Sequence, residues 1–135
     1  MPERALISKE LATLFGVLSH PHRIRIVEEL GSQERDVQTL QGLLGINQSG
    51  VSQHLSVLRA HRIVEERREG RHVYYHLRQP QLAAWLVNGM EFIGASPAAY
   101  EEFRTAVERV RALWLEGAHS EEPEDPGPDG QAAAH

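Results

Sequence analysis

The chain has 135 residues, no cysteine and a formal net charge of −5. A chain of this length supports one domain with a modest core, and without cysteine it forms no disulfide, zinc–thiolate site or thiol redox sensor. Its first residues lack the layout of a secretion signal, and no apolar run approaches the ~20 residues that span a bilayer. We therefore expect a soluble, cytoplasmic protein with no membrane contact.

The acidic charge is concentrated at the C-terminal end. Five of the nineteen acidic residues lie in 119–135, which has no Lys or Arg, so residues 1–118 hold fourteen acidic and fourteen basic residues. Within 47–78, six arginines stand against three glutamates. Because the local field matters more than net charge in binding a polyanion, the composition does not exclude nucleic acid as a partner.

The first two expected helices are amphipathic. Apolar residues at helical spacing predict a helix over 5–19. Pro21 suits the first turn of a second helix, where its missing N–H costs nothing, and Gly31 ends that helix. The buried stripe of the second helix is expected to hold Ile24, Val27 and Leu30.

Two shorter helices should follow, joined by a tight turn. Asp36 can cap the first of them, and Gly45 can adopt the left-handed conformation that stops it. Asn47 can then cap the next helix, whose inward residues are Val51, Leu55 and Leu58. Two short helices around the turn 44–47 have the layout of a helix-turn-helix.

A β-hairpin is expected over 63–77. Pairing Val64 with Tyr75 and Glu66 with Val73 centres the turn on Glu69-Gly70. One face, turned to the core, then holds Val64, Val73, Tyr75 and Leu77, and the other holds Ile63, Glu65, His72, Tyr74 and His76. The arginine-rich turn over 67–71 would project from the body.

The last part of the chain favours association. Residues 80–93 predict a helix that is apolar around much of its circumference and needs cover on two sides, for example from its own domain and a second subunit. Ser96 and Pro97 should begin a final helix with a short heptad seam of Tyr100, Phe103, Val107, Val110 and Trp114. We expect a domain over 1–95, an additional helix over 96–117 and an acidic disordered tail over 118–135.

The chemistry of the chain is concentrated in 47–77. A polar helix start fits the edges of base pairs in a major groove, and a basic hairpin fits the neighbouring phosphates. The sequence has no nucleophile–base pair at a motif spacing, no glycine-rich phosphate loop and no clustered carboxylates outside the tail. We therefore expect double-stranded DNA as the partner, no catalytic residue and no cofactor.

Three stretches, LSHPHRIRIVEEL (18–30), QSGVSQHLSVLR (48–59) and IVEERREGRHVYYHL (63–77), carry a family resemblance. In this order and spacing they resemble the ArsR family of bacterial winged-helix repressors, over about residues 10–93. The resemblance implies a mainly α fold with a β-hairpin wing, which dimerises through its N- and C-terminal helices. It implies a homodimeric repressor that binds an inverted-repeat operator and inserts its fourth helix into the major groove.

The resemblance also implies residue roles. The expected DNA-contacting residues are Gln48, Ser49, Ser52, Gln53 and His54 on the fourth helix and Arg67, Arg68 and Arg71 on the wing. For His54 a packing role is an open alternative. The family resemblance and the apolar patterns together predict a dimer interface at Leu11, Leu14, Leu18, Leu82, Trp85, Leu86, Phe103, Val107, Val110 and Trp114.

One junction departs from the family pattern. The family usually has a small residue pair with glycine before the first strand, where this chain has His61-Arg62. If Arg62 adopts a positive φ, it costs roughly 1 kcal/mol relative to glycine. Otherwise the helix ends differently, or Arg62 serves another purpose such as a phosphate contact.

The family's metal sites are not expected here. Asp36 and Gln38 occupy the positions of a common cysteine pair, and 80–95 lacks the His and Asp of a second site. His72 and His76 lie roughly 13 Å apart along a strand, too far to share one ion. His20 and His22 belong to a stretch that is structural in the family, so we expect no metal site.

The signal that controls the protein stays open. The aromatic residues of the last two helices form either a dimer core or a small-molecule pocket. The third alternative is a repressor without an effector pocket, controlled by its abundance or by a protein partner. The alternative function is a winged-helix interaction module without specific DNA binding. The acidic tail either competes with nonspecific DNA for the arginines or only keeps the protein soluble.

Overall fold

The structure, a computed structural model, describes residues 1–94 and 97–119, of which 97–98 and 114–119 are described as backbone only. In chain order the elements are α1 (Pro2–Leu18), α2 (Pro21–Leu30), α3 (Val37–Leu44), α4 (Gln48–Ala60), β1 (Val64–Glu69), β2 (His72–Leu77), α5 (Gln81–Gly89), a 3-10 turn η1 (Met90–Phe92) and α6 (Pro97–His119). The predicted mainly α fold with a β-hairpin wing is confirmed. The predicted cap Ser96 and most of the predicted tail lie outside the described residues.

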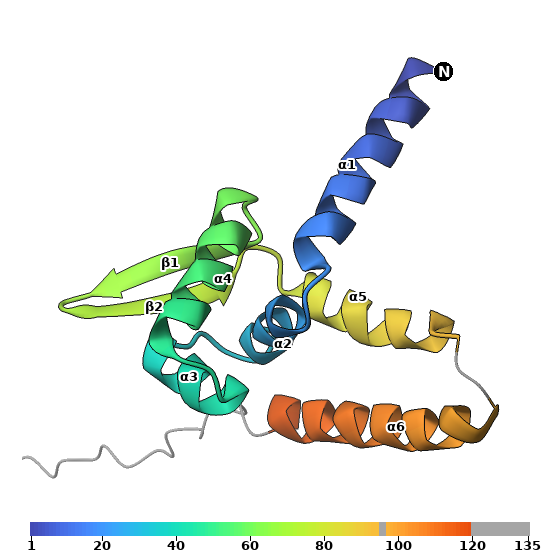
Figure 1. Ribbon diagram of the computed structural model, residues 1–135. Coiled ribbons are helices and arrows are strands. Elements are labelled where there is room, and N and C mark those ends of the chain that lie inside the picture. The colour runs from blue at the N-terminus through green and yellow to red at the C-terminus, as the bar shows by residue number, and fades with distance from the viewer. Residues whose placement is uncertain (95–96, 120–135) are drawn as a thin grey trace, which may run out of the picture.

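Helix α2 lies at the centre of the fold and packs against α3, α4, α5 and β2 (Figure 1). The core is formed by apolar residues of several elements, and its largest fully buried side chains are Ile26, Val27, Leu40, Val51, Leu55, Leu58 and Val64. The predicted inward residues of α4 are therefore confirmed. Ile24, which was predicted in the buried stripe of α2, is instead 38% exposed.

The helix caps follow the sequence predictions. Asp36 Oδ1 accepts a hydrogen bond from the Thr39 backbone N–H at 2.7 Å, and this bond holds the pKa of the carboxyl below its usual value. Gly45 ends α3 with a φ of 68°, in the left-handed conformation. Asn47 Oδ1 accepts from the Gly50 N–H at 2.7 Å and so begins α4. The helix-turn-helix is therefore set by local capping chemistry.

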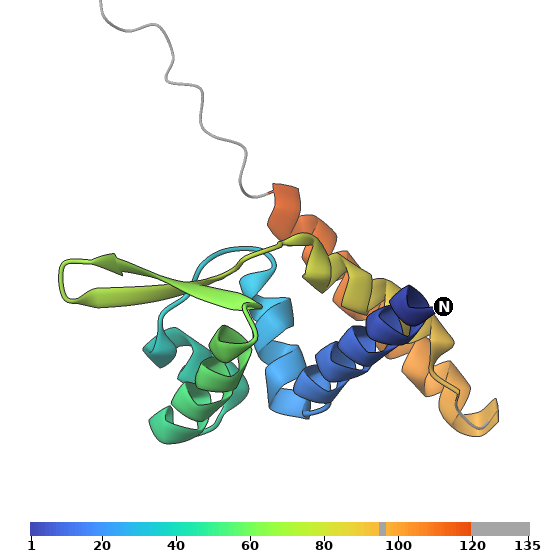
Figure 2. The same cartoon turned by 90° about the horizontal axis from the view of Figure 1, so that it is seen from above.

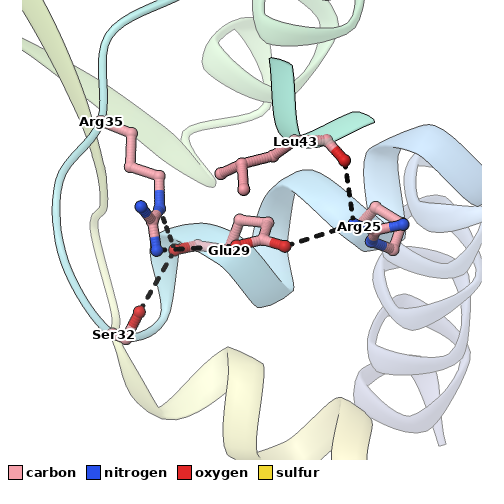
Figure 3. Close-up of polar contacts among 5 residues, drawn as sticks. All are labelled: Arg25, Glu29, Ser32, Arg35 and Leu43. Atoms are coloured by element: carbon pink, nitrogen blue, oxygen red, sulfur yellow. Dashed lines mark hydrogen bonds and ion pairs between the residues drawn. The ribbon is translucent and has the colours of Figure 1, made fainter. Parts of the chain in front are cut away.

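A polar network fixes α2 to the segments around it (Figure 3). Arg25 pairs with Glu29 at 3.3 Å and also donates to the Leu43 carbonyl at the end of α3. Arg35 donates to the Glu29 carbonyl at 3.0 Å. Arg35 also exchanges backbone hydrogen bonds with Tyr75, at 3.0 and 2.8 Å, which ties the segment before α3 to the edge of β2.

The hairpin register differs from the prediction by two residues. Val64 pairs with Leu77 and Glu66 with Tyr75, so the turn is Gly70-Arg71 and not Glu69-Gly70. Gly70 has a φ of 59° at the first central position of the turn, where a type II′ hairpin requires glycine. Because side chains alternate with a period of two, this slip preserves the predicted faces, and Val64 and Leu77 are both buried.

Ile63 was predicted on the outer face of the hairpin and is instead buried, at 8% exposure. It precedes β1, where its N–H donates to the Leu58 carbonyl and its carbonyl accepts from the Arg78 N–H. These two bonds turn the chain out of α4 and close the base of the wing. The Ile63 side chain therefore belongs to the core.

Helix α1 projects from this body. Figures 1 and 2 show α1 extending away from the core to a free N-terminal end, on the side of the molecule opposite the wing. The predicted helix over 80–93 ends at Gly89 and continues as η1, and the last helix extends to His119, beyond its predicted end. Arg111 of α6 pairs with Glu91 at 2.8 Å. Among the described residues no helix is both long and apolar enough to cross a membrane.

Arg62 adopts the positive φ that its position suggested. Its φ is 58°, and its N–H donates to the Arg59 carbonyl at 3.0 Å as α4 ends. No other non-glycine residue among those described has a positive φ. The chain therefore accepts left-handed strain here where glycine would be relaxed.

Arg62→Gly should accordingly raise the free energy of unfolding by about 1 kcal/mol. Arg62→Ala is the matched control, since it removes the same charge but keeps a Cβ in the left-handed conformation. Urea denaturation of the three proteins measures the difference. Equal stability of the glycine and alanine variants would contradict the assignment of strain to this residue.

Candidate nucleic-acid interface

The exposed face of α4 is polar and lies directly after the tight turn. Gln48, Ser49, Ser52 and Gln53 are all exposed, as predicted for residues that meet DNA. Ser49 Oγ donates to Asn47 Oδ1 at 3.1 Å, so the cap also orients the first serine. A Cβ on Gly50 would lie 3.1 Å from the same oxygen, so glycine leaves room for the cap to close. We call α4 the recognition helix from here on.

His54 differs from its neighbours on the recognition helix. It is half-buried, and its ring lies 4.4 Å from that of His20, centroid to centroid. Burial, together with the charges of His20, Arg23 and His22, lowers the pKa of His54 below its ordinary value. At neutral pH the ring is therefore uncharged and packed. The structure favours the packing role for His54 over the predicted DNA contact.

Arg67 is engaged within the wing. Its guanidinium forms a bidentate pair with Glu34, with a shortest distance of 2.6 Å, and also pairs with Glu69 at 3.0 Å. It lies 4.9 Å from the centroid of the Tyr74 ring. The Arg67 bond lowers the pKa of Glu34, and both carboxylates raise the pKa of Arg67. Arg67 thus braces the hairpin against the segment before α3, and its predicted phosphate contact would require breaking this pair.

The other two predicted wing arginines are more available. Arg68 is 73% exposed and has a loose pair with Glu66 at 3.6 Å. Arg71 is exposed at the turn, and no ion pair joins it to the described residues. The wing turn projects beyond the recognition helix in both views of the fold. Arg71 is therefore the best placed of the three to meet a phosphate.

The structure places further basic residues beside the recognition helix, and of these the sequence analysis considered only Arg62 as a possible phosphate contact. Arg59, Arg62 and Arg78 line a hollow of about 460 Å³ between the end of the recognition helix and β1. Arg23 and Ser56 line another, beside Ser49, Ser52 and Gln53. Local spacing does not predict that Arg59, Arg62 and Arg78 lie together, because the end of α4 and the two ends of the hairpin meet only in the folded chain.

A pair of wing substitutions separates bracing from phosphate contact. Arg71→Ala should weaken binding to all DNA sequences alike and reduce the salt dependence by about one phosphate contact. Arg67→Ala should leave the salt dependence near that of the original protein, because its charge is already neutralised by Glu34. Fluorescence anisotropy over a series of salt concentrations measures both. If the slope of log affinity against log salt concentration changed equally in the two variants, the bracing role of Arg67 would be contradicted.

A polar recognition helix behind a tight turn, with a basic hairpin beside it, defines a winged helix-turn-helix DNA-binding protein. A family model described as a helix-turn-helix domain matches residues 18–67. The biofilm growth-associated repressor of Xylella fastidiosa is 41% identical over 83 residues, which cover 62% of this chain and 72% of the relative. The chain belongs to the ArsR family of winged helix-turn-helix transcriptional regulators.

Further comparisons agree with this family. A transcriptional repressor SmtB homolog of Synechocystis is 39% identical over 70 residues, about half the length of each chain (52% and 53%). The solved repressor BigR of Xylella fastidiosa has a TM-score of 0.59 at 33% identity, covering 68% of this chain and 91% of BigR. A homodimeric winged helix-turn-helix domain from Mycobacterium bovis, described as a possible ArsR-family regulator, has a TM-score of 0.57 at 27% identity, covering 64% and 82%.

Proposed function

We propose that this regulator is a homodimeric repressor that binds an inverted-repeat operator and occludes a promoter. The observation that carries the proposal is the exposed polar face of α4, held between the helix-turn-helix core and the basic wing. Several relatives are named repressors, which supports this proposal over an interaction module without DNA binding. Each protomer would bind one half-site, and the two-fold axis would require an inverted repeat.

Exposed apolar side chains support the homodimer. Among the expected interface residues Leu11 and Trp85 are each 46% exposed, and Leu14, Leu82 and Leu86 are half-buried. Phe15, which is 53% exposed, stacks on Trp85 with 5.8 Å between the ring centroids. Large apolar residues this exposed on neighbouring helices are typical of a covered interface. Leu18 departs from the expectation, since at 3% exposure it belongs to the core of one protomer.

The C-terminal helix fits the same role. Phe103, Val107 and Val110 are half-buried along α6, and the Trp114 side chain lies outside the described residues. An open apolar groove of about 600 Å³ between α1, α2 and α5 is lined by Phe15, Ile24, Trp85, Phe92 and Ile93. We assign this groove to the second protomer and not to a small-molecule effector, because its apolar lining continues onto the exposed face of α1.

A footprinting experiment on the DNA around the protein's own gene tests the proposed function. The full-length protein should protect an inverted repeat and bind it at least about a thousandfold more tightly than random DNA at physiological salt. Protection of no site, or equal affinity for every sequence, would contradict a sequence-specific repressor. Salt-dependent affinity for random DNA alone would reduce the function to nonspecific binding.

A further inference from the structure

Three imidazoles that are separated in the sequence meet beside the recognition helix. His20 and His22 flank Pro21 at the start of α2, and His54 lies on α4. The ring centroid of His22 lies 5.3 Å from that of His20 and 5.6 Å from that of His54. One nitrogen of each ring lies within 4.8 Å of the other two, and all three residues are half-buried. Among the described residues this is the one group of three side chains so placed to hold a metal ion.

The ring nitrogens of this cluster are largely unengaged. The one hydrogen bond found for them is from the His22 backbone N–H to His20 Nδ1, at 3.1 Å, while the rings of His22 and His54 have no hydrogen-bond partner among the described residues. Neutral imidazole nitrogens are common ligands of transition-metal ions. Arg23 is the cationic neighbour, and its side chain is drawn aside by a hydrogen bond to the Val17 carbonyl.

We infer that His20, His22 and His54 form a binding site for one divalent transition-metal ion of the zinc class, with an open position for water. Imidazole nitrogens suit zinc, copper and nickel, whereas magnesium and calcium require oxygen ligands. Three histidines with an open fourth position are a known zinc arrangement. The site uses neither the third nor the fifth helix, where the family resemblance places its metal ligands, and it departs from the expectation of no metal.

Small rotations of the rings would complete the coordination. With metal–nitrogen distances of about 2.0–2.1 Å, tetrahedral ligand nitrogens lie about 3.3 Å apart. The rings therefore need to approach by about 1.5 Å from their present limit of 4.8 Å. His20 Nδ1 accepts the His22 N–H bond that caps α2. Coordination of a metal through Nδ1 replaces this bond, and coordination through Nε2 requires the tautomer with a proton on Nδ1, which also removes it. The His22 amide should report this exchange.

The ion would connect the recognition helix to the central helix. His54 follows Gln53, an expected base contact, while His20 and His22 belong to the start of α2. A metal bond would fix α4 in one orientation and add positive charge beside the exposed serines. This role rests on the proposed DNA-binding function. The bound metal then acts as a co-repressor, because it raises the affinity of the protein for DNA.

Cobalt titration of the full-length protein, with any purification tag removed, tests the site itself. Co²⁺ should give visible d–d bands of a nitrogen and oxygen site, saturating at one ion per protomer, and Zn²⁺ should displace it. His54→Ala and His22→Ala should each weaken Co²⁺ binding at least about tenfold. His72→Ala, which removes an exposed histidine of the wing, is the matched control and should bind normally.

His20→Asn removes one ligand and retains the cap of α2. Asparagine supplies a capping oxygen for α2 but no imidazole, so the helix start is retained while one ligand is lost. Its thermal unfolding without metal should match that of the original protein, and its Co²⁺ affinity should fall. Unchanged Co²⁺ affinity in His20→Asn and His22→Ala, or absence of the bands from the original protein, would overturn the site.

Anisotropy with operator DNA, with Zn²⁺ or with a chelator, tests the coupling separately. Zn²⁺ should tighten operator binding at least about fivefold in the original protein and not in His20→Asn. Metal binding without any change in DNA affinity would overturn the co-repressor role and leave the site. Operator binding that is intact while Co²⁺ binding is absent would overturn the site and leave the repressor function.

Discussion

Phe15→Glu should convert the protein to a monomer and lower its operator affinity by about two to four orders of magnitude. Phe15 is 53% exposed in one chain and stacks on Trp85, at the edge of the apolar groove between α1, α2 and α5. A carboxylate buried there without a partner opposes association. Two linked half-site contacts gain about 10²–10⁴ in affinity over one, and a monomer loses that gain.

Sedimentation velocity and operator anisotropy on the same samples measure the two effects. Leu43→Glu is the matched control for association, because Leu43 is an exposed leucine on α3, away from the apolar groove. Since Phe15 lies mostly outside the core, the fold of the variant should persist, which circular dichroism checks. A Phe15→Glu protein that stays dimeric would contradict the proposed interface.

The local features of the fold were predictable because their causes lie within a few residues. Asp36 and Asn47 cap helices through bonds to N–H groups three residues ahead, and Gly45 ends α3 by a conformation that glycine adopts readily. Gln48 and Ser49 begin the helix that the Asn47 cap defines, and both are exposed, as their polar character favours. The polar face of the candidate site therefore could be placed from sequence alone.

The hairpin register required information from elsewhere in the fold. Gly70 fits a two-residue turn at either the first or the second central position, and both registers keep Val64 and Tyr75 on the same face. The structure selects the register in which Val64 and Leu77 pair as a buried couple over the core. Local turn chemistry leaves this choice open, and packing against α2 and α4 decides it.

The roles of Arg67 and His54 differ most from the sequence prediction, because both depend on contacts with residues far away in the sequence. Arg67 pairs with Glu34, which lies 33 residues earlier in the chain. His54 meets His20 and His22 only because α4 packs against the start of α2. In the sequence Arg67 is one arginine of a basic turn, and His54 is one polar residue of a helix. Neither role is encoded in local spacing, so each appeared only with the tertiary structure.

Gln48→Ala should remove base discrimination worth about 1–3 kcal/mol at one position of each half-site. Gln48 is the exposed first residue of α4, and its amide offers both a donor and an acceptor to a base edge, a pairing that suits adenine. Alanine offers neither, so every base at that position becomes equivalent. Because no hydrogen bond joins the Gln48 side chain to the described residues, replacing it should leave the free energy of unfolding unchanged.

The measurement compares operator variants in which a single base pair is changed symmetrically in both half-sites. The original protein should discriminate strongly at one position, and Gln48→Ala should bind all four variants there with similar affinity. Its affinity for random DNA and its salt dependence should stay unchanged, in contrast to Arg71→Ala, which shifts both. A Gln48→Ala protein that loses affinity equally for operator and random DNA would place Gln48 among the phosphate contacts. The division of labour between a base-reading helix and a phosphate-binding wing therefore rests on the difference between these two variants.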